Sequence, residues 1–178
     1  MRALDVPERL SWAVRILDPA PDDRVLEIGC GRGVAVGLLC DRLTTGTVTA
    51  VDRSASAVAA ARRRNREAVA AGRAAFHVRS LEETDFATGS FDKVLAVNVN
   101  LFWTRPADAE LTALRRWLAP AGMLCLCWEP PDGRRAGEIA GKVERAVAAA
   151  GFATRTVRDD GLVAVLGVLP GEGRPGQS

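Results

Sequence analysis

The sequence predicts an α/β protein whose mostly parallel sheet carries helices on both faces. Three observations predict this doubly wound architecture. Strand-type and helix-type segments alternate along the chain, the alternation ends in a hairpin signal, and 178 residues suit a single core. We expect one domain over residues 1–170, followed by a flexible Gly/Pro-rich tail at 171–178.

The expected strands are short apolar runs, several of them rich in β-branched residues. They cover residues 25–28, 47–51, 75–79, 91–97 and 123–128. The expected helices have apolar residues at helical spacing or begin at a typical start residue, such as Ser54 or Pro106. They cover residues 7–17, 33–43, 54–71, 106–118 and 136–150. Strands joined through helices in this way favour parallel pairing.

The end of the chain predicts a β-hairpin. Strand-type runs at 154–157 and 162–169 are separated by Arg158-Asp159-Asp160-Gly161. Asp-Gly tolerates positive φ and is a strong hairpin signal. The hairpin should add one antiparallel strand to the sheet.

Composition excludes several classes of function. Hydrophobic residues make up 48% and the net charge is +2, too small to imply a nucleic-acid or anionic-membrane partner. The arginines of residues 62–66 spread around a helix, which favours a solvated face over an RNA site. The four cysteines and one histidine form no zinc pattern, so no metal is expected. No signal-peptide core or membrane-length apolar run is visible, and the expected location is the cytoplasm.

The loop after the first strand is the most informative segment. It reads Glu27-Ile28-Gly29-Cys30-Gly31-Arg32-Gly33, at a strand-to-helix junction where α/β sheets bind ligands. The dinucleotide pattern G-x-G-x-x-G/A fails from either starting glycine, because valine occupies its last position. The pattern E-x-G-x-G-x-G fits every position, and its leading acid suits a cationic ligand.

Asp52 ends the second strand, downstream of that loop. A carboxylate there can accept hydrogen bonds from both hydroxyls of a ribose. The alternative is that Asp52 only caps the following helix. Its spacing from the glycine loop favours ribose binding.

Together these segments resemble the class I S-adenosylmethionine (SAM)-dependent methyltransferases over roughly residues 20–169. The resemblance includes the acid-GxGxG loop, Asp52, the fourth strand Phe91-Asp92-Lys93-Val94-Leu95-Ala96-Val97-Asn98, and Leu118-Ala119-Pro120-Ala121-Gly122-Met123-Leu124 before the fifth. It implies a Rossmann-like sheet of order 3-2-1-4-5-7-6. The terminal hairpin supplies strands six and seven, which the dinucleotide-binding fold lacks.

The resemblance also implies cofactor contacts with SAM and its product, S-adenosylhomocysteine. Glu27 and the loop residues Gly29, Cys30, Gly31 and Gly33 should surround the methionyl part. Asp52 should hold the ribose, with Arg53 beside the adenine. The family often has an acid after strand three, where this chain has Ser80, followed by Leu81. Asn98, at the end of strand four, should lie near the methyl donor.

Catalytic residues are less clearly marked. Asn98 and Glu129 are the candidates, Asn98 to orient a nucleophile and Glu129 as a general base. Asn98 and Asn100 could equally be turn residues. His77 lies inside the third expected strand, which indicates a packed core histidine.

We expect a small-molecule acceptor. The alternatives are an RNA or protein methyltransferase, or a non-catalytic SAM-binding subunit. The N-terminal helix, within residues 1–20, should pack on or cover the site. A second copy of the chain, in a homodimer, is an alternative source of a site wall.

Overall fold

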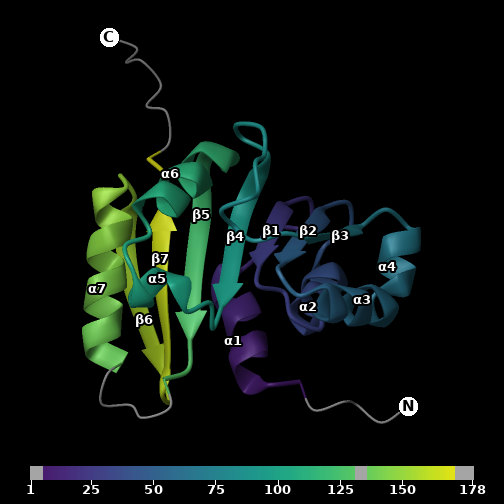
Figure 1. The fold of residues 1–178 in the computed structure, drawn as a ribbon, viewed down its shortest axis with the longest axis horizontal. Helices are drawn as coiled ribbons and strands as arrows, with labels where there is room; N and C mark the ends of the chain where they lie inside the picture. Colours follow the sequence, from purple (N-terminus) through teal and green to yellow (C-terminus); the bar gives the residue numbers. More distant parts are fainter. Residues whose placement is uncertain (1–5, 131–135, 171–178) are drawn as a thin grey trace.

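The computed structural model describes residues 6–130 and 136–170, which form one seven-stranded sheet with helices on both faces (Figure 1). The strands are β1 (Arg24–Ile28), β2 (Thr47–Asp52), β3 (Ala74–Val78), β4 (Phe91–Val97), β5 (Leu118–Trp128), β6 (Ala153–Asp159) and β7 (Leu162–Val168). The helices are α1 (Glu8–Leu17), α2 (Val34–Arg42), α3 (Ala55–Arg64), α4 (Arg66–Ala70), α5 (Leu101–Thr104), α6 (Asp108–Trp117) and α7 (Ala136–Ala149).

The sheet order is β3-β2-β1-β4-β5-β7-β6, which confirms the expected topology. β1 to β5 pair in parallel, whereas β7 runs antiparallel to both β5 and β6. The expected tail at 171–178 lies outside the described residues. Among the described residues, no helix has the length and apolar character needed to cross a membrane.

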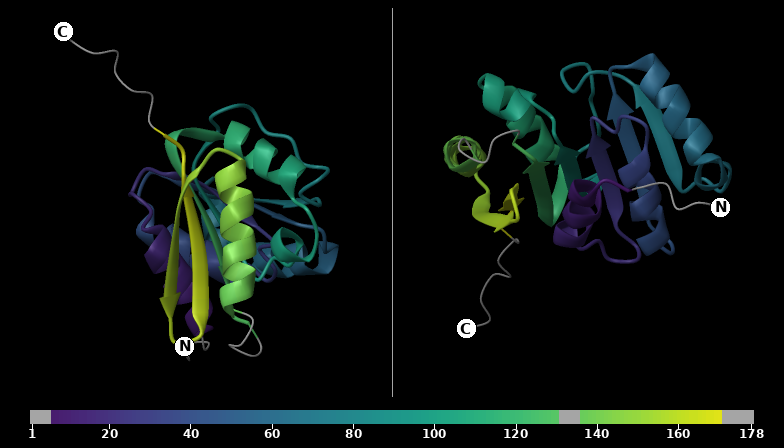
Figure 2. Two further views of the ribbon diagram at one scale, coloured as in Figure 1. Left: turned by 90° about the vertical axis from the view of Figure 1, so that its left-hand side faces the viewer. Right: turned by 90° about the horizontal axis from the view of Figure 1, so that it is seen from below.

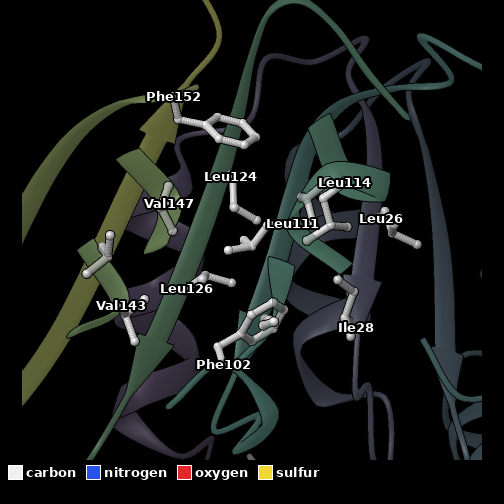
Figure 3. Close-up of a cluster of buried hydrophobic side chains, with 14 of the residues drawn as sticks. Leu26, Ile28, Phe102, Leu111, Leu114, Leu124, Leu126, Val143, Val147 and Phe152 are labelled. Carbon is white, nitrogen blue, oxygen red and sulfur yellow. The ribbon is translucent and has the colours of Figure 1, made fainter. Parts of the chain in front are cut away.

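Helices cover both faces of the sheet (Figure 2), and two layers of apolar side chains attach them to it. Side chains alternate between the faces of a strand, so Leu124 and Leu126 of β5 join one layer and Cys125 and Cys127 the other. Figure 3 shows the first layer, in which α6 and α7 pack their apolar residues against β5. The second layer joins α1, α2 and α3 to the opposite face.

A lysine from β4 caps the end of α1. Lys93 Nζ donates to the carbonyl oxygens of Leu17 and Asp18, at 2.7 and 2.6 Å. These carbonyls end a helix and lack intrahelical partners, and a cation there also suits the helix dipole. The contact fixes α1 against the sheet, where it packs on α2, β4 and β5.

The helix expected over 54–71 is broken at Asn65 into α3 and α4. The buried Asn65 side chain donates from Nδ2 to the carbonyls of Ala61 and Gly33, both at 2.9 Å. A side-chain amide that bonds the backbone four residues earlier competes with helical pairing. The Asn65 side chain at this break therefore connects the end of α3 to the loop after β1.

The boundary between α6 and β5 also differs from expectation. The helix predicted for 106–118 begins at Asp108 and ends at Trp117, and β5 begins at Leu118 rather than at residue 123. Phe91 pairs with Leu118 and Lys93 with Met123, so the turn-like residues between form an irregularity within the strand. A short helix that the sequence did not predict, α5, follows β4.

β3 forms one edge of the sheet, and this changes the interpretation of His77. The histidine is exposed, so the prediction of a packed core residue was wrong. Consecutive side chains of a strand point to opposite faces of the sheet, so His77 points away from the face on which Phe76 is buried. The outer side of the strand is partly covered, because Arg62 Nη2 donates to the Phe76 carbonyl at 2.5 Å.

The Asn65 contact predicts a measurable loss of stability. Asn65→Ala should lower the free energy of unfolding by about 1–3 kcal/mol, because the buried Gly33 carbonyl loses a donor. The adjacent and exposed Arg64→Ala is the matched control and should change it by less than about 0.5 kcal/mol. Urea denaturation of both variants tests this, and equal effects would contradict it.

Candidate functional site

A cavity of about 500 Å³ opens beyond the carboxyl ends of β1, β2, β3 and β4. This edge is where parallel α/β sheets bind ligands. The cavity is lined by Ile28, Gly29, Val51, Asp52, Arg53, Arg79, Ser80, Leu81, Glu82, Asn98, Val99, Asn100, Leu101, Thr104 and Arg105. Several predicted site residues are therefore brought together, namely Gly29, Asp52, Arg53, Ser80, Leu81 and Asn98.

The glycine loop needs its glycines for conformation and for space. Gly29, Gly31 and Gly33 have φ of 69°, 51° and 74°, in the left-handed region that other residues rarely adopt. A Cβ on Gly29 would lie 2.7 Å from Val99 Cγ2, and one on Gly33 would lie 2.6 Å from Asn65 Nδ2. The loop thus passes close to both α3 and the segment after β4.

Backbone hydrogen bonds fold this loop onto the end of β2. The N–H groups of Gly29 and Cys30 donate to the Val51 carbonyl, at 2.8 and 3.2 Å. Asp52 continues the contact, because its Oδ2 accepts from Gly31 N at 2.8 Å and its Oδ1 from Ser54 N at 2.9 Å. Each carboxylate oxygen keeps a further lone pair for a donor in the cavity.

Glu27 lies beneath the loop and does not line the cavity. The residue is 3% exposed, and its Oε2 has no hydrogen-bond partner among the described residues. Burial, reinforced by the nearby charge of Asp52, raises the pKa of Glu27 to about 8, with the Val36 backbone N–H acting in the opposite direction. Without a cationic partner, Glu27 is therefore mainly protonated at neutral pH.

The other predicted loop residues also lie outside the cavity lining. Cys30 and Gly33 are buried, and Gly31 is half-buried with its N–H on Asp52. Burial raises the pKa of the Cys30 thiol to about 12, so the thiol is neutral. Their position supports a role in shaping the loop backbone.

Ser80 is held by a neighbouring carboxylate. Its backbone N–H and its hydroxyl both donate to Glu83 Oε2, at 3.2 and 2.9 Å. Because the hydroxyl proton is committed, the Ser80 Oγ is left as an acceptor toward the cavity. Arg53 and the buried Leu81 line the cavity with it.

Asn98 closes the other side of the cavity. It has a φ of 56°, which asparagine tolerates better than most residues. Its backbone N–H donates to the Cys127 carbonyl at 2.8 Å, and its Oδ1 accepts from Glu129 N at 3.0 Å. The amide oxygen is therefore occupied, which leaves the side-chain NH₂ as the group available to a ligand.

The Glu129 carboxylate, unlike Asn98, lies outside the cavity. Its Oε2 accepts from Arg9 Nη1 of α1 at 3.2 Å. This ion pair therefore joins α1 to the end of β5, and none of the lining residues belongs to α1.

Sequence reasoning missed a charged cluster at the cavity wall. Arg105 Nη2 lies 2.5 Å from both Glu82 Oε1 and Glu110 Oε1. Glu82 follows β3, Arg105 follows α5 and Glu110 belongs to α6, so no local motif marks them. Arg79, which also lines the cavity, was missed for the same reason.

Comparison with known proteins gives consistent similarities. A family model described as a methyltransferase domain matches residues 25–122, more than half of the chain. Over 136 residues the chain is 31% identical to trans-aconitate 2-methyltransferase of Variovorax paradoxus, covering 74% of this chain and 47% of that protein. The chain spans less than half the length of the curated relatives it matches.

Solved structures share the fold at lower identity. A chain from the complex of the Haloferax volcanii Trm112 methyltransferase activator with a methyltransferase aligns with a TM-score of 0.76 and 18% identity, covering 91% of this chain and 89% of that one. An S-adenosylmethionine-dependent methyltransferase from Mesorhizobium loti aligns with a TM-score of 0.70 and 17% identity, covering 92% and 99%.

The raised pKa of Glu27 predicts a pH-dependent stability. Between about pH 4.5 and 8 the folded chain binds a proton that the unfolded chain has released, so stability should fall as pH rises through this window. As pH rises through this window, the unfolding free energy of the wild type should fall by roughly a few kcal/mol relative to that of Glu27→Gln.

Urea denaturation of both proteins at about pH 5 and about pH 8 measures this difference. The exposed Glu67→Gln is the matched control and should run parallel to wild type. If the unfolding free energies of Glu27→Gln and wild type changed equally with pH, the Glu27 carboxyl would not be held neutral in the folded protein.

Proposed function

Because the chain belongs to the class I SAM-dependent methyltransferases, we propose that it transfers the methyl group of SAM to a small-molecule acceptor bound in the cavity. The observation that carries this proposal is the Asp52 carboxylate. It joins the glycine loop to the end of β2 and also lines the cavity. This combination supplies both a shaped loop and two oriented acceptor oxygens.

The residues present fit this cofactor. SAM offers an ammonium group, two ribose hydroxyls and an adenine, and the chain offers complementary groups at the carboxyl edge of the sheet. We assign the methionyl part to the loop backbone from Gly29 to Gly33. Glu27 lies beneath this loop with an unpartnered Oε2, and its ionised form would favour the positive charge of that part. The remaining lone pairs of Asp52 suit the ribose hydroxyls.

We assign the adenine to the residues that follow β3, beside Asp52 at the end of the neighbouring β2. Ser80 Oγ, held as an acceptor by Glu83, suits the exocyclic amino group. Leu81 supplies an apolar surface beside it, and Arg53 follows Asp52 along the same wall. This arrangement replaces the acid that the family often places after strand three.

When bound, SAM supplies an electrophilic methyl group on a sulfonium. The chain's contribution is alignment, which is worth up to ~7–11 kcal/mol in well-oriented reactions. Asn98 is suited to this role, because Glu129 N fixes its amide oxygen and thereby orients its NH₂ donors. A base is needed only for an acceptor that arrives protonated, and Glu129 could serve only after its ion pair with Arg9 opens.

The ribose assignment predicts a loss of cofactor affinity. Asp52→Ala should weaken S-adenosylhomocysteine binding by about thirtyfold or more, because it removes charge-assisted hydrogen bonds and the Gly31 contact. Isothermal titration measures this, with a thermal melt to confirm folding. Asp41→Ala, at an exposed position on α2, is the matched control and should bind as wild type.

Two outcomes would count against the proposal. Full affinity in Asp52→Ala would refute the ribose contact. No S-adenosylhomocysteine binding by wild type would favour a subunit that has lost the cofactor. Methyl transfer itself is tested with labelled SAM, first on trans-aconitate, the substrate named for the relatives, and then on metabolite and RNA pools.

A further inference from the structure

Arg105 links the segment after β3, which lines the cavity, to α6. Its Nη2 bonds Glu82, which follows β3, and Glu110 on α6, while its Nη1 donates to the Pro106 carbonyl at 3.0 Å. A guanidinium has five N–H donors, so these contacts leave two of them without a partner among the described residues. Arg105 lines the cavity and its side chain is 44% exposed, so these donors are accessible to a ligand.

The two carboxylates that hold Arg105 differ in exposure. The Glu110 side chain is 6% exposed, and burial makes this contact costly to break. The Glu82 side chain is 53% exposed, and an ion pair at such a site contributes little to stability. Glu110 is therefore the fixed anchor of the guanidinium, and Glu82 is a partner that another anion can replace.

The charge of the cavity lining favours an anion. The ionisable lining residues are three arginines, Arg53, Arg79 and Arg105, and two acids, Asp52 and Glu82. Both Asp52 oxygens already accept backbone N–H groups. SAM adds a net positive charge, so a second cation would be repelled and an anion attracted.

We propose that the methyl acceptor is a small molecule bearing a carboxylate, which binds the Arg105 guanidinium in place of Glu82. Arg105 then determines acceptor specificity, because its planar fork matches a carboxylate better than a neutral or cationic group. The exchange leaves the Glu110 contact intact and moves the Glu82 carboxylate into solvent. This inference rests on the proposed function, because it assigns an acceptor contact in the same cavity.

Titration of propane-1,2,3-tricarboxylate into the protein saturated with S-adenosylhomocysteine tests the proposal. The acid should bind, and its trimethyl ester should bind at least about tenfold more weakly, because the charge-assisted contacts are lost. Arg105→Lys, which keeps a cation beside Glu110, should weaken the acid by about tenfold. Glu82→Gln should strengthen it by about two- to fivefold, because the competing anion is gone.

The matched controls are Arg116→Lys and Asp85→Asn. Arg116 of α6 pairs with Asp85 of the segment after β3, and neither residue lines the cavity. Both controls should bind the acid and S-adenosylhomocysteine as wild type does.

Several results would overturn the inference. These are no binding of the acid to the S-adenosylhomocysteine complex, equal binding of acid and ester, or an acid affinity that Glu82→Gln leaves unchanged or lowers. A matching loss of S-adenosylhomocysteine affinity in Arg105→Lys would assign Arg105 to the cofactor and also overturn it. If wild type fails to bind S-adenosylhomocysteine at all, the proposed function fails instead.

Discussion

The site depends on one constraint, which is that the loop after β1 must fold back onto the end of β2. Three backbone N–H groups of the loop meet this requirement, two through the Val51 carbonyl and one through the Asp52 carboxylate. Glycines make the path available, because each takes a left-handed conformation. Asn65 supports the loop from the other side through the Gly33 carbonyl. Two residues of β2 and Asn65, at the junction of α3 and α4, therefore hold one short segment in place.

The electrostatics of the site follow from this arrangement. Folding the loop over β1 buries Glu27 and leaves one of its oxygens without a partner, which raises its pKa. Across the cavity the charges are instead paired, with Arg105 between a buried and an exposed acid. A buried carboxyl with one unpartnered oxygen thus lies beneath the glycine loop, whereas Arg105 pairs with one buried and one exposed acid.

Most strand and helix positions were predictable because they depend on local signals repeated along the chain, and the sheet order was implied by the family resemblance that these signals carry. Apolar runs, the glycine loop and the Asp-Gly turn each leave a mark within a few residues. The break at Asn65 was not predictable, because it depends on a carbonyl contributed by Gly33 from a different element. The exposure of His77 was missed although the expected sheet order already placed the third strand at an edge, where a strand has a neighbour on one side only.

The same distinction applies to the site. Asp52 and the glycines were visible as a spaced motif, and the structure brings Asp52 and Gly29 to one cavity. The Arg105 cluster joins three segments that are distant in sequence, and arginines and glutamates are common on any surface. Residue type alone gave no reason to select them. The Arg9 contact of Glu129 was hidden in the same way, since it joins α1 to the end of β5.

The contact between Arg62 and the outer edge of β3 has a consequence for behaviour in concentrated solution. An edge strand offers unpaired backbone groups that can recruit a strand from another molecule, which is a route to aggregation. Here the Arg62 guanidinium already donates to the Phe76 carbonyl, and the same helix, α3, carries the exposed Arg63 and Arg64. An incoming strand would have to displace that donor before it could extend the sheet. The arginine-rich helix thus protects the edge of the sheet against intermolecular β-pairing.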